Sequence, residues 1–174
     1  MNTSKPGFAI ASIGIAIRKR FVLNSLLFCA ALFISLPGLS QPLPLGSEKG
    51  LPAVEVYKSA QCGCCKAWAE HLQKNGFRVI LHDVDDIPAE RRRLGMPDKY
   101  GSCHVAKAGK YVVEGHVPAA DIKKLLKQKP KAIGLAVPAM PLGSPGMEME
   151  DGRSEPYDTL LVTPDGEAKV FARH

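Results

Sequence analysis

Three cysteines lie within four positions, in the segment Gln61-Cys62-Gly63-Cys64-Cys65-Lys66. The preceding residues, 53–57, alternate apolar and polar side chains as a half-buried strand does, and residues 66–75 favour a helix that ends at Gly76. The thiols are therefore expected at or near a helix N-terminus, where free amides and the helix dipole favour an anion. Because thiolate is the nucleophilic and metal-binding form of cysteine, this segment predicts a reactive or metal-binding site.

The same segment contains the Cys-x-x-Cys spacing of a redox dithiol, with Cys62 and Cys65 as the attacking and resolving thiols. Cys64 lies between them and would compete as the resolving group. For a soft cation such as Cu(I), additional thiolates are instead an advantage, and sulfur can bridge two ions. A zinc site of four cysteines matches poorly, because such sites usually take two separate Cys-x₂₋₄-Cys pairs.

Three further donors follow along the chain: Cys103, His104 and His116. The first two begin a predicted strand, and in a thioredoxin-like fold that strand start faces the turn that carries the clustered cysteines. His116 lies in a Gly-His-x-Pro turn before the last predicted helix, which is an unusual place for a plain core residue. The predicted metal ligands are thus Cys62, Cys64, Cys65, Cys103, His104 and His116, with copper as the metal.

The other histidines and the methionines have simpler explanations. We expect His71 and His82 at the surface and a frayed end at His174. Met140 and Met147 could supply thioether ligands, but packing within their loop is the favoured interpretation.

The element order predicts an α/β, thioredoxin-like domain with a central mixed sheet and flanking helices. Strands are expected at 53–57, 77–84, 103–107 and 111–115, and helices at 66–75, 86–94 and 117–128. The first strand, helix and second strand form a right-handed βαβ unit. Residues 134–149, rich in Gly, Pro and Met, are expected to be a loop. Residues 159–163 and 168–171 predict a C-terminal β-hairpin.

The N-terminus has the features of an export signal. A basic segment, Arg18-Lys19-Arg20, precedes an apolar segment at 21–36, and the small residues Gly38 and Ser40 predict cleavage before Gln41. The apolar segment is short for a membrane span, which needs about 20 residues, so no stable span is expected after cleavage; an uncleaved anchor is the alternative. The predicted organisation is a signal peptide at 1–40, a flexible tether at 41–52 and one domain at 53–174, located in the periplasm.

Charge and cysteine count limit the alternatives. The formal net charge is +6, but residues 1–40 contribute four positive charges and no acidic residue, which leaves the domain near +2. Its Lys and Arg are scattered among Asp and Glu, so a nucleic-acid surface is not indicated. A disulfide-stapled structural module is a third hypothesis. Bridges within 62–65 would close loops too short to stabilise much, and a bridge from Cys62, Cys64 or Cys65 to Cys103 is the alternative pairing.

Several motifs occur in one order along the domain: Val56–Trp68 with its Cys-x-Cys-Cys triad, Cys103-His104, Val113–Pro118 and Gly134–Glu148. This series resembles the CopG-type family of exported thioredoxin-like proteins associated with copper resistance, from about residue 54 to residue 171. The resemblance implies periplasmic copper handling with a proposed redox function, copper ligands at the triad and Cys103, and other periplasmic copper-handling proteins as partners. The sequence departs from the family at Ala139, where glycine is expected, which matters only if that position requires a positive φ.

Overall fold

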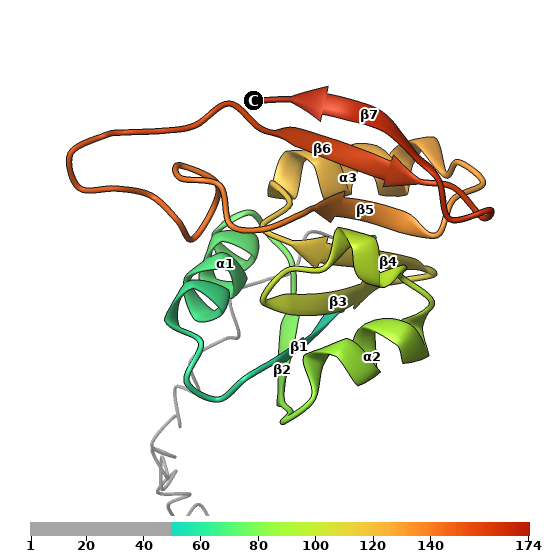
Figure 1. Cartoon of the computed structure of the whole chain (residues 1–174), viewed down its shortest axis with the longest axis horizontal. Coiled ribbons are helices and arrows are strands. Elements are labelled where there is room, and N and C mark those ends of the chain that lie inside the picture. The colour runs from blue at the N-terminus through green and yellow to red at the C-terminus, as the bar shows by residue number, and fades with distance from the viewer. Residues whose placement is uncertain (1–49) are drawn as a thin grey trace, which may run out of the picture. The chain divides into compact units, whose positions relative to one another are not determined.

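The computed structural model describes residues 50–174, which form seven strands and three α-helices (Figure 1). In chain order the elements are β1 (Val54–Lys58), α1 (Gly63–Lys74), β2 (Val79–Asp83), α2 (Ile87–Leu94), the 3-10 turn η1 (Asp98–Tyr100), β3 (His104–Ala108), β4 (Tyr111–Gly115), α3 (Ala119–Gln128), β5 (Gly134–Val137), β6 (Asp158–Val162) and β7 (Ala168–Arg173). The predicted signal peptide and the tether up to residue 49 lie outside the described residues. Within 50–174, no helix has the length and apolar character needed to cross a membrane.

All seven strands belong to one mixed sheet with the order β2-β1-β3-β4-β5-β6-β7. β1 and β2 are parallel and are joined by α1, whereas β3 runs antiparallel to both β1 and β4. This confirms the predicted α/β class with a central mixed sheet. The first four strands have the order and directions expected of a thioredoxin-like domain.

The C-terminal hairpin β6–β7 is present as predicted, but it is not a separate appendage. Residues 134–137, expected to begin a loop, form the strand β5, which pairs parallel to β4 and antiparallel to β6. The hairpin therefore continues the central sheet. The strand was missed because its four residues are all buried, and a strand buried on both faces lacks the alternation that marks a half-buried one.

The sheet carries a hydrophobic core on each face, because successive side chains of a strand point to opposite sides. One core joins β-strand residues to α1 and α3 through Trp68, Leu72, Ile122 and Leu125. The other, on the side of α2 and η1, is smaller and includes Met96 and Tyr100 with side chains of β3 to β6. Figure 1 shows the sheet between these helices.

The register of the strands brings the predicted site residues to one end of the sheet. Lys58, the last residue of β1, pairs with His104, the first of β3. β4 runs antiparallel to β3, so its last residue, Gly115, lies at the same end of the sheet as His104. There Gly115 pairs with Val137 of β5. The turn before α1, the start of β3 and the end of β4 therefore meet at this end.

Candidate metal centre

The clustered cysteines occupy the start of α1. The helix begins earlier than predicted, at Gly63, so Cys64 and Cys65 lie in its first turn and Cys62 is the N-cap residue. Sγ of Cys62 accepts a hydrogen bond from the amide of Cys65 at 3.3 Å, in the way that an oxygen side chain usually caps a helix. Trp68 is fully buried and anchors this turn through a 2.8 Å bond from its indole N–H to the carbonyl of Val117.

Cys62 and Cys65 are joined by a disulfide bond, whereas Cys64 and Cys103 are free thiols. The Cys-x-x-Cys frame is thus in its oxidised form, and two of the predicted thiolate ligands are bonded to each other. The two free thiols argue against a module in which every cysteine serves as a structural bridge. A site with four thiolates requires the reduced form of the Cys62–Cys65 pair.

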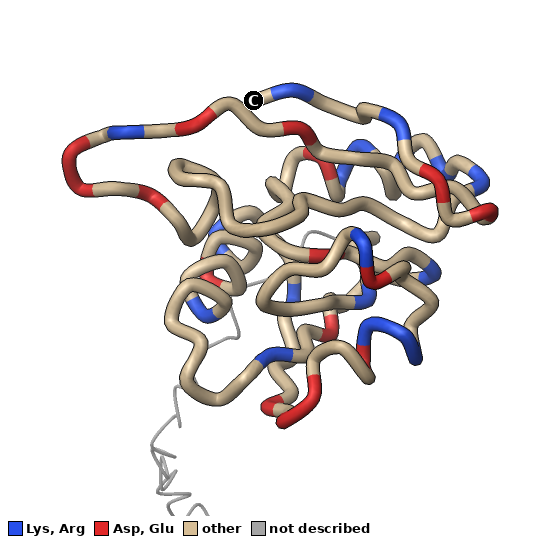
Figure 2. Tube along the Cα trace, in the orientation of Figure 1, with Lys and Arg blue, Asp and Glu red and all other residues tan. Residues whose placement is uncertain are grey.

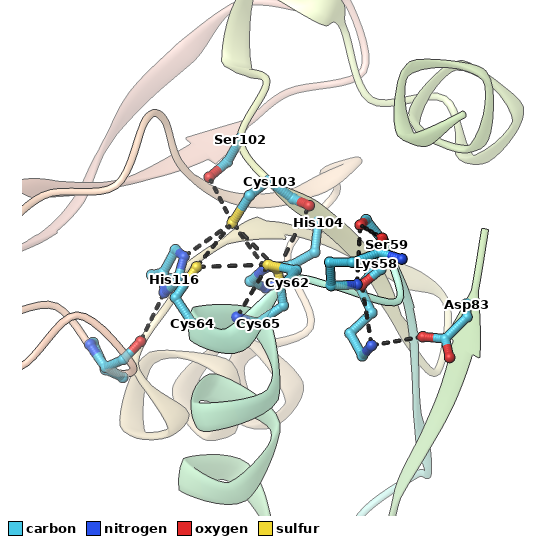
Figure 3. The surroundings of a disulfide bond; sticks show 12 residues. Lys58, Ser59, Cys62, Cys64, Cys65, Asp83, Ser102, Cys103, His104 and His116 are labelled. Atoms are coloured by element: carbon cyan, nitrogen blue, oxygen red, sulfur yellow. Dashed lines mark hydrogen bonds and ion pairs between the residues drawn. A yellow bond between two sulfur atoms is a disulfide. The ribbon is translucent and has the colours of Figure 1, made fainter. Parts of the chain in front are cut away.

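Cys103 lies at the centre of the cluster (Figure 3). Its Sγ lies 3.9 Å from Sγ of Cys64 and 3.5 Å from Sγ of Cys65, and Sγ of Cys62 lies 3.6 Å from that of Cys64. One donor atom from each of the four cysteines falls within 4.8 Å of the others. A second group with the same property consists of Cys103, His104 and His116 and shares Cys103 with the first. The structure therefore brings the predicted ligands into two groups that meet at Cys103.

His116 is oriented toward Cys103 by the residues that hold its ring. Its Nδ1 donates to the carbonyl of Pro145 at 2.8 Å, which leaves the lone pair of Nε2 directed at Sγ of Cys103, 3.1 Å away. The preceding Gly115 allows the end of β4 to pack closely against its neighbours: its φ is +71°, and a Cβ there would clash with the carbonyl oxygen of Val137 and with Ser102. A second residue that fixes the unligated nitrogen of a histidine is typical of metal-binding imidazoles.

His104 is fully buried. The centroid of its ring lies 4.4 Å from that of the Trp68 ring and 5.1 Å from that of the His116 ring. Its Nδ1 lies 3.5 Å from Sγ of Cys103, and its Nε2 is buried with no hydrogen-bond partner in the described part of the chain. Burial lowers the pKa of His104 to about 3, with a smaller contribution from His116. The ring is consequently neutral at ordinary pH and keeps a lone pair for a metal.

Cys103 is held as a neutral thiol in this state. Burial raises its pKa to about 12, and the neighbouring Cys64 adds to that rise. Burial lowers the pKa of His116. Both the Cys103 thiol and the His116 ring are therefore held in their neutral forms. A metal ion would reverse this preference, because coordination deprotonates the thiol outright. The residues present thus suit a cation with sulfur and nitrogen ligands.

Two buried charged residues that the sequence reasoning did not consider hold the peptide before Cys103. The carboxylate of Glu114 accepts the amide N–H of Ser102 at 2.7 Å, and Arg91 donates to the carbonyl of Ser102 at 2.8 Å. Arg91 and Glu114 also form an ion pair of 3.0 Å and are 5 % and 0 % exposed. The sequence did contain a sign of this pair. Glu114 lies within the apolar run 111–117, and an acidic residue is rarely buried without a charged partner.

The segment 138–147, here called the strap, packs against the cluster from the other side. Gly146 lies so close to α1 that a Cβ there would be 2.7 Å from both the carbonyl oxygen of Cys64 and the amide of Trp68. The hydroxyl of Ser102 donates to the carbonyl of Ala139, and that alanine has φ +61°, so the position does favour glycine. The strap carries no charged side chain (Figure 2).

Other predicted roles have mixed outcomes. His71 is partly buried, and its Nε2 accepts the amide of Ala119 at the start of α3. His82 is partly exposed and stacks on Tyr57. The expectation of a frayed His174 is wrong, because its Nε2 contacts the carboxylate of Asp121 at 2.9 Å. Met140 is 47 % exposed, so the expectation that it packs within its loop is wrong.

Comparisons with known proteins address the chain as a whole. A family model described as "Protein of unknown function, DUF411" matches residues 100–147. Two solved structures, named "Copper resistance protein copG", Form 1 and Form 2, are each 48 % identical in sequence with a TM-score of 0.67. Each match covers 71 % of this chain and 98 % of the other. No curated protein matches the sequence.

Fold and site together define an α/β domain with a thioredoxin-like order of its first four strands and a cluster of thiols and imidazoles suited to a metal. The chain is 48 % identical to the two solved structures over nearly their full length, which is enough to assign a family. The chain belongs to the CopG copper resistance family.

Proposed function

We propose that this protein binds copper ions in the periplasm through its clustered cysteines and contributes to copper resistance. The observation that carries the proposal is the convergence of four sulfurs and two imidazoles from α1, β3 and the end of β4 (Figure 3). Cysteine sulfur is the ligand that selects Cu(I), and thiolates can bridge adjacent ions. The names of the two solved relatives support copper as the metal.

In this proposal the reduced protein is the form that takes up Cu(I). Reduction of the Cys62–Cys65 bond supplies two thiolates beside Cys64 and Cys103, so that four sulfurs become available. The same bond allows electron exchange with copper. Two Cu(I) ions that give up one electron each become Cu(II), and with two protons they reduce the disulfide to two thiols. Other periplasmic copper-handling proteins would deliver or accept the ions.

The direct test is a titration of the reduced domain, residues 41–174, with Cu(I) against a competing chelator under anaerobic conditions. The expected result is tight binding that the Cys62→Ser/Cys64→Ser/Cys65→Ser variant lacks. Met140→Leu is the matched control, because Met140 is exposed on the strap and has no assigned ligand role. Weak binding by the reduced domain, or equal binding by the triple variant, would contradict the proposal.

A second candidate function is thiol–disulfide exchange by Cys62 and Cys65, which the disulfide in the structure favours directly. Cys62 is the N-cap residue and is partly exposed, whereas Cys65 is buried, as expected of attacking and resolving thiols. This function predicts catalysis by metal-free protein that survives Cys64→Ser. Absence of disulfide reduction by the metal-free protein would remove it.

A further inference from the structure

Two of the four clustered cysteines lie outside the disulfide bond. Cys62 and Cys65 are bonded to each other, whereas Cys64 and Cys103 are free thiols. Both free thiols are partly exposed, so a small reagent can reach them. Two free thiols in one protein can themselves be oxidised to a disulfide, provided that their sulfurs can meet.

The two free thiols are neighbours within the cluster. Sγ of Cys64 lies 3.9 Å from Sγ of Cys103, near van der Waals contact (Figure 3). A disulfide bond has a length of about 2.05 Å, so the sulfurs must approach each other by about 2 Å, a movement of the size that side-chain rotation provides. The pair is therefore positioned for a second bond.

The other sulfurs near these two thiols are already engaged. Sγ of Cys62 lies 3.6 Å from that of Cys64, and Sγ of Cys65 lies 3.5 Å from that of Cys103. Both of these neighbours belong to the existing bond. While that bond is intact, Cys64 and Cys103 are the one pair of free thiols among residues 50–174.

His116 adds an observation that is independent of the sulfur distances. Its Nδ1 is bonded to the carbonyl of Pro145, and its Nε2 faces Sγ of Cys103 at 3.1 Å. An imidazole nitrogen within hydrogen-bond reach is the usual activating base of a cysteine nucleophile. Cys103 is thus the thiol of the pair that is arranged to attack.

We propose that Cys64 and Cys103 are a second redox couple, which an external disulfide oxidises to a Cys64–Cys103 bond while the Cys62–Cys65 bond is already formed. First the sulfur of Cys103 attacks the external disulfide, which gives a mixed disulfide and releases one thiol that carries the proton of Cys103. Then Cys64 attacks Sγ of Cys103, and the second thiol leaves with the proton of Cys64. One external disulfide is thereby reduced to two thiols, and the couple gives up two electrons and two protons.

The second bond differs from the first in what it joins. Cys62 and Cys65 are 3 residues apart at the start of one helix, whereas Cys64 and Cys103 are 39 residues apart, in α1 and immediately before β3. The second bond therefore ties the helix to the sheet and leaves the described residues without a free thiol. That this state has no thiolate for copper is the one consequence that rests on the proposed function.

The test contains no copper. Residues 41–174, which hold every described strand and helix and lack Cys29, are prepared with the Cys62–Cys65 bond and treated with excess oxidised glutathione. The expected result is a fall from two free thiols per chain to none, with no bound glutathione, and a Cys64–Cys103 link in the tandem mass spectrum of the digested protein. Thiols that persist or end as glutathione adducts would overturn the inference. So would a Cys62–Cys64 link together with a Cys65–Cys103 link.

Variants isolate the couple. Cys62→Ser/Cys65→Ser retains only Cys64 and Cys103 and should lose both thiols to an intramolecular bond in monomeric protein. Cys103→Ser is the matched control, because Cys64 then has no free partner and should end as a glutathione adduct. An adduct on the double variant, in protein with a native circular dichroism spectrum, would contradict the second couple.

The Cu(I) titration described above separates this inference from the proposed function. If the second bond forms but the reduced domain binds Cu(I) weakly, the couple stands and the copper proposal fails. If the reduced domain binds Cu(I) tightly but the Cys64–Cys103 bond does not form, the inference alone fails.

Discussion

Two polar clusters in the described part of the domain differ in how their polar atoms are paired. The thiol–imidazole cluster around Cys103 leaves Nε2 of His104 without a partner among the described residues, and its two free thiols lie 3.9 Å apart. The C-terminal clamp, made of Asp121, Thr159 and His174, is satisfied throughout. The Thr159 hydroxyl and His174 Nε2 both contact Asp121 Oδ2, at 2.7 and 2.9 Å, and His174 stacks on Tyr157.

The difference separates a binding role from a structural one. A buried polar group costs free energy unless it is hydrogen-bonded, so the clamp is a set of groups that stabilise one another and join α3 to β6 and the chain end. The cluster around Cys103 instead places several sulfur and nitrogen donors within 4.8 Å of one another, as a metal ion requires. Substitutions in the cluster should therefore change metal binding, whereas those in the clamp should change stability.

The largest expected effect comes from Arg91, which belongs to neither cluster and supports the first. Arg91→Met leaves Glu114 buried without its ion pair and Ser102 without a donor, so we expect a loss of about 3–5 kcal/mol in the free energy of unfolding. Chemical denaturation measures it. Arg92→Met on the same helix breaks only an exposed pair with Asp98 and should cost less than about 1 kcal/mol. Equal losses would show that the buried pair has no special role.

Cys103→Ser tests the metal cluster at its centre. We expect Cu(I) affinity to fall by about 100-fold or more, because Cys103 belongs to both donor groups. The free energy of unfolding should change by less than about 1 kcal/mol, since a serine hydroxyl can make the same contact with Nε2 of His116. A competition titration and a denaturation curve on the same sample give both values. A large stability loss with unchanged affinity would reverse the roles assigned to the two clusters.

Asp121→Ala tests the clamp, and here stability should fall while Cu(I) affinity is unchanged. Removal of the carboxylate leaves the Thr159 hydroxyl and the His174 ring without their common partner, so we expect a loss of about 2 kcal/mol in stability. Cu(I) affinity should stay at the parental value. Weakened copper binding in this variant, at a temperature where it remains folded, would show that the two clusters are coupled.

His71 provides a test that depends on pH. Burial lowers the pKa of His71, and its neutral Nε2 accepts the amide of Ala119. The folded state therefore favours the neutral ring, so its stabilisation is present above the ordinary value of 6.5 and is lost as the pH falls below it. His71→Gln should reduce the acid-induced loss of stability by on the order of 1 kcal/mol, the value of one hydrogen bond. An unchanged dependence between about pH 7 and about pH 5 would exclude this role.

The smallest effect concerns the strap over the cluster. Ala139 has φ +61°, a conformation that an alanine adopts only at a cost. Ala139→Gly should raise the free energy of unfolding by about 0.5–1 kcal/mol, because glycine occupies this region freely. Thermal denaturation measures the change, and Cu(I) affinity serves as the control that should not move. A destabilised variant would mean that the methyl group contributes packing that outweighs the strain.

The sequence predicted the elements that depend on local pattern. α1 with its thiols, the βαβ unit and the amphipathic α3 all follow from periodicity and capping signals, and all are present. The convergence of Cys103 and His104 on α1 was predicted from the strand order, and the pairing of Lys58 with His104 confirms it. These features required only short-range pattern and one topological rule.

Other features depend on long-range contacts that a single sequence does not display. β5 has no alternation, and Arg91 contacts Ser102 and Glu114 from a separate helix. The bond from His116 to Pro145 crosses between segments far apart in the chain. The Cys62–Cys65 disulfide was one of several possible pairings, and spacing alone could not choose among them.

The incorporation of β5 has a consequence for the behaviour of the domain in solution. Without β5 to β7, β4 would be an exposed edge of buried, apolar residues, the type of edge that recruits other strands and leads to aggregation. Instead the sheet ends at β7, whose residues are largely exposed and include Lys169 and Arg173, and a bulge interrupts its pairing with β6. On this side the sheet therefore ends in a charged and irregular strand and not in the apolar edge that β4 would present.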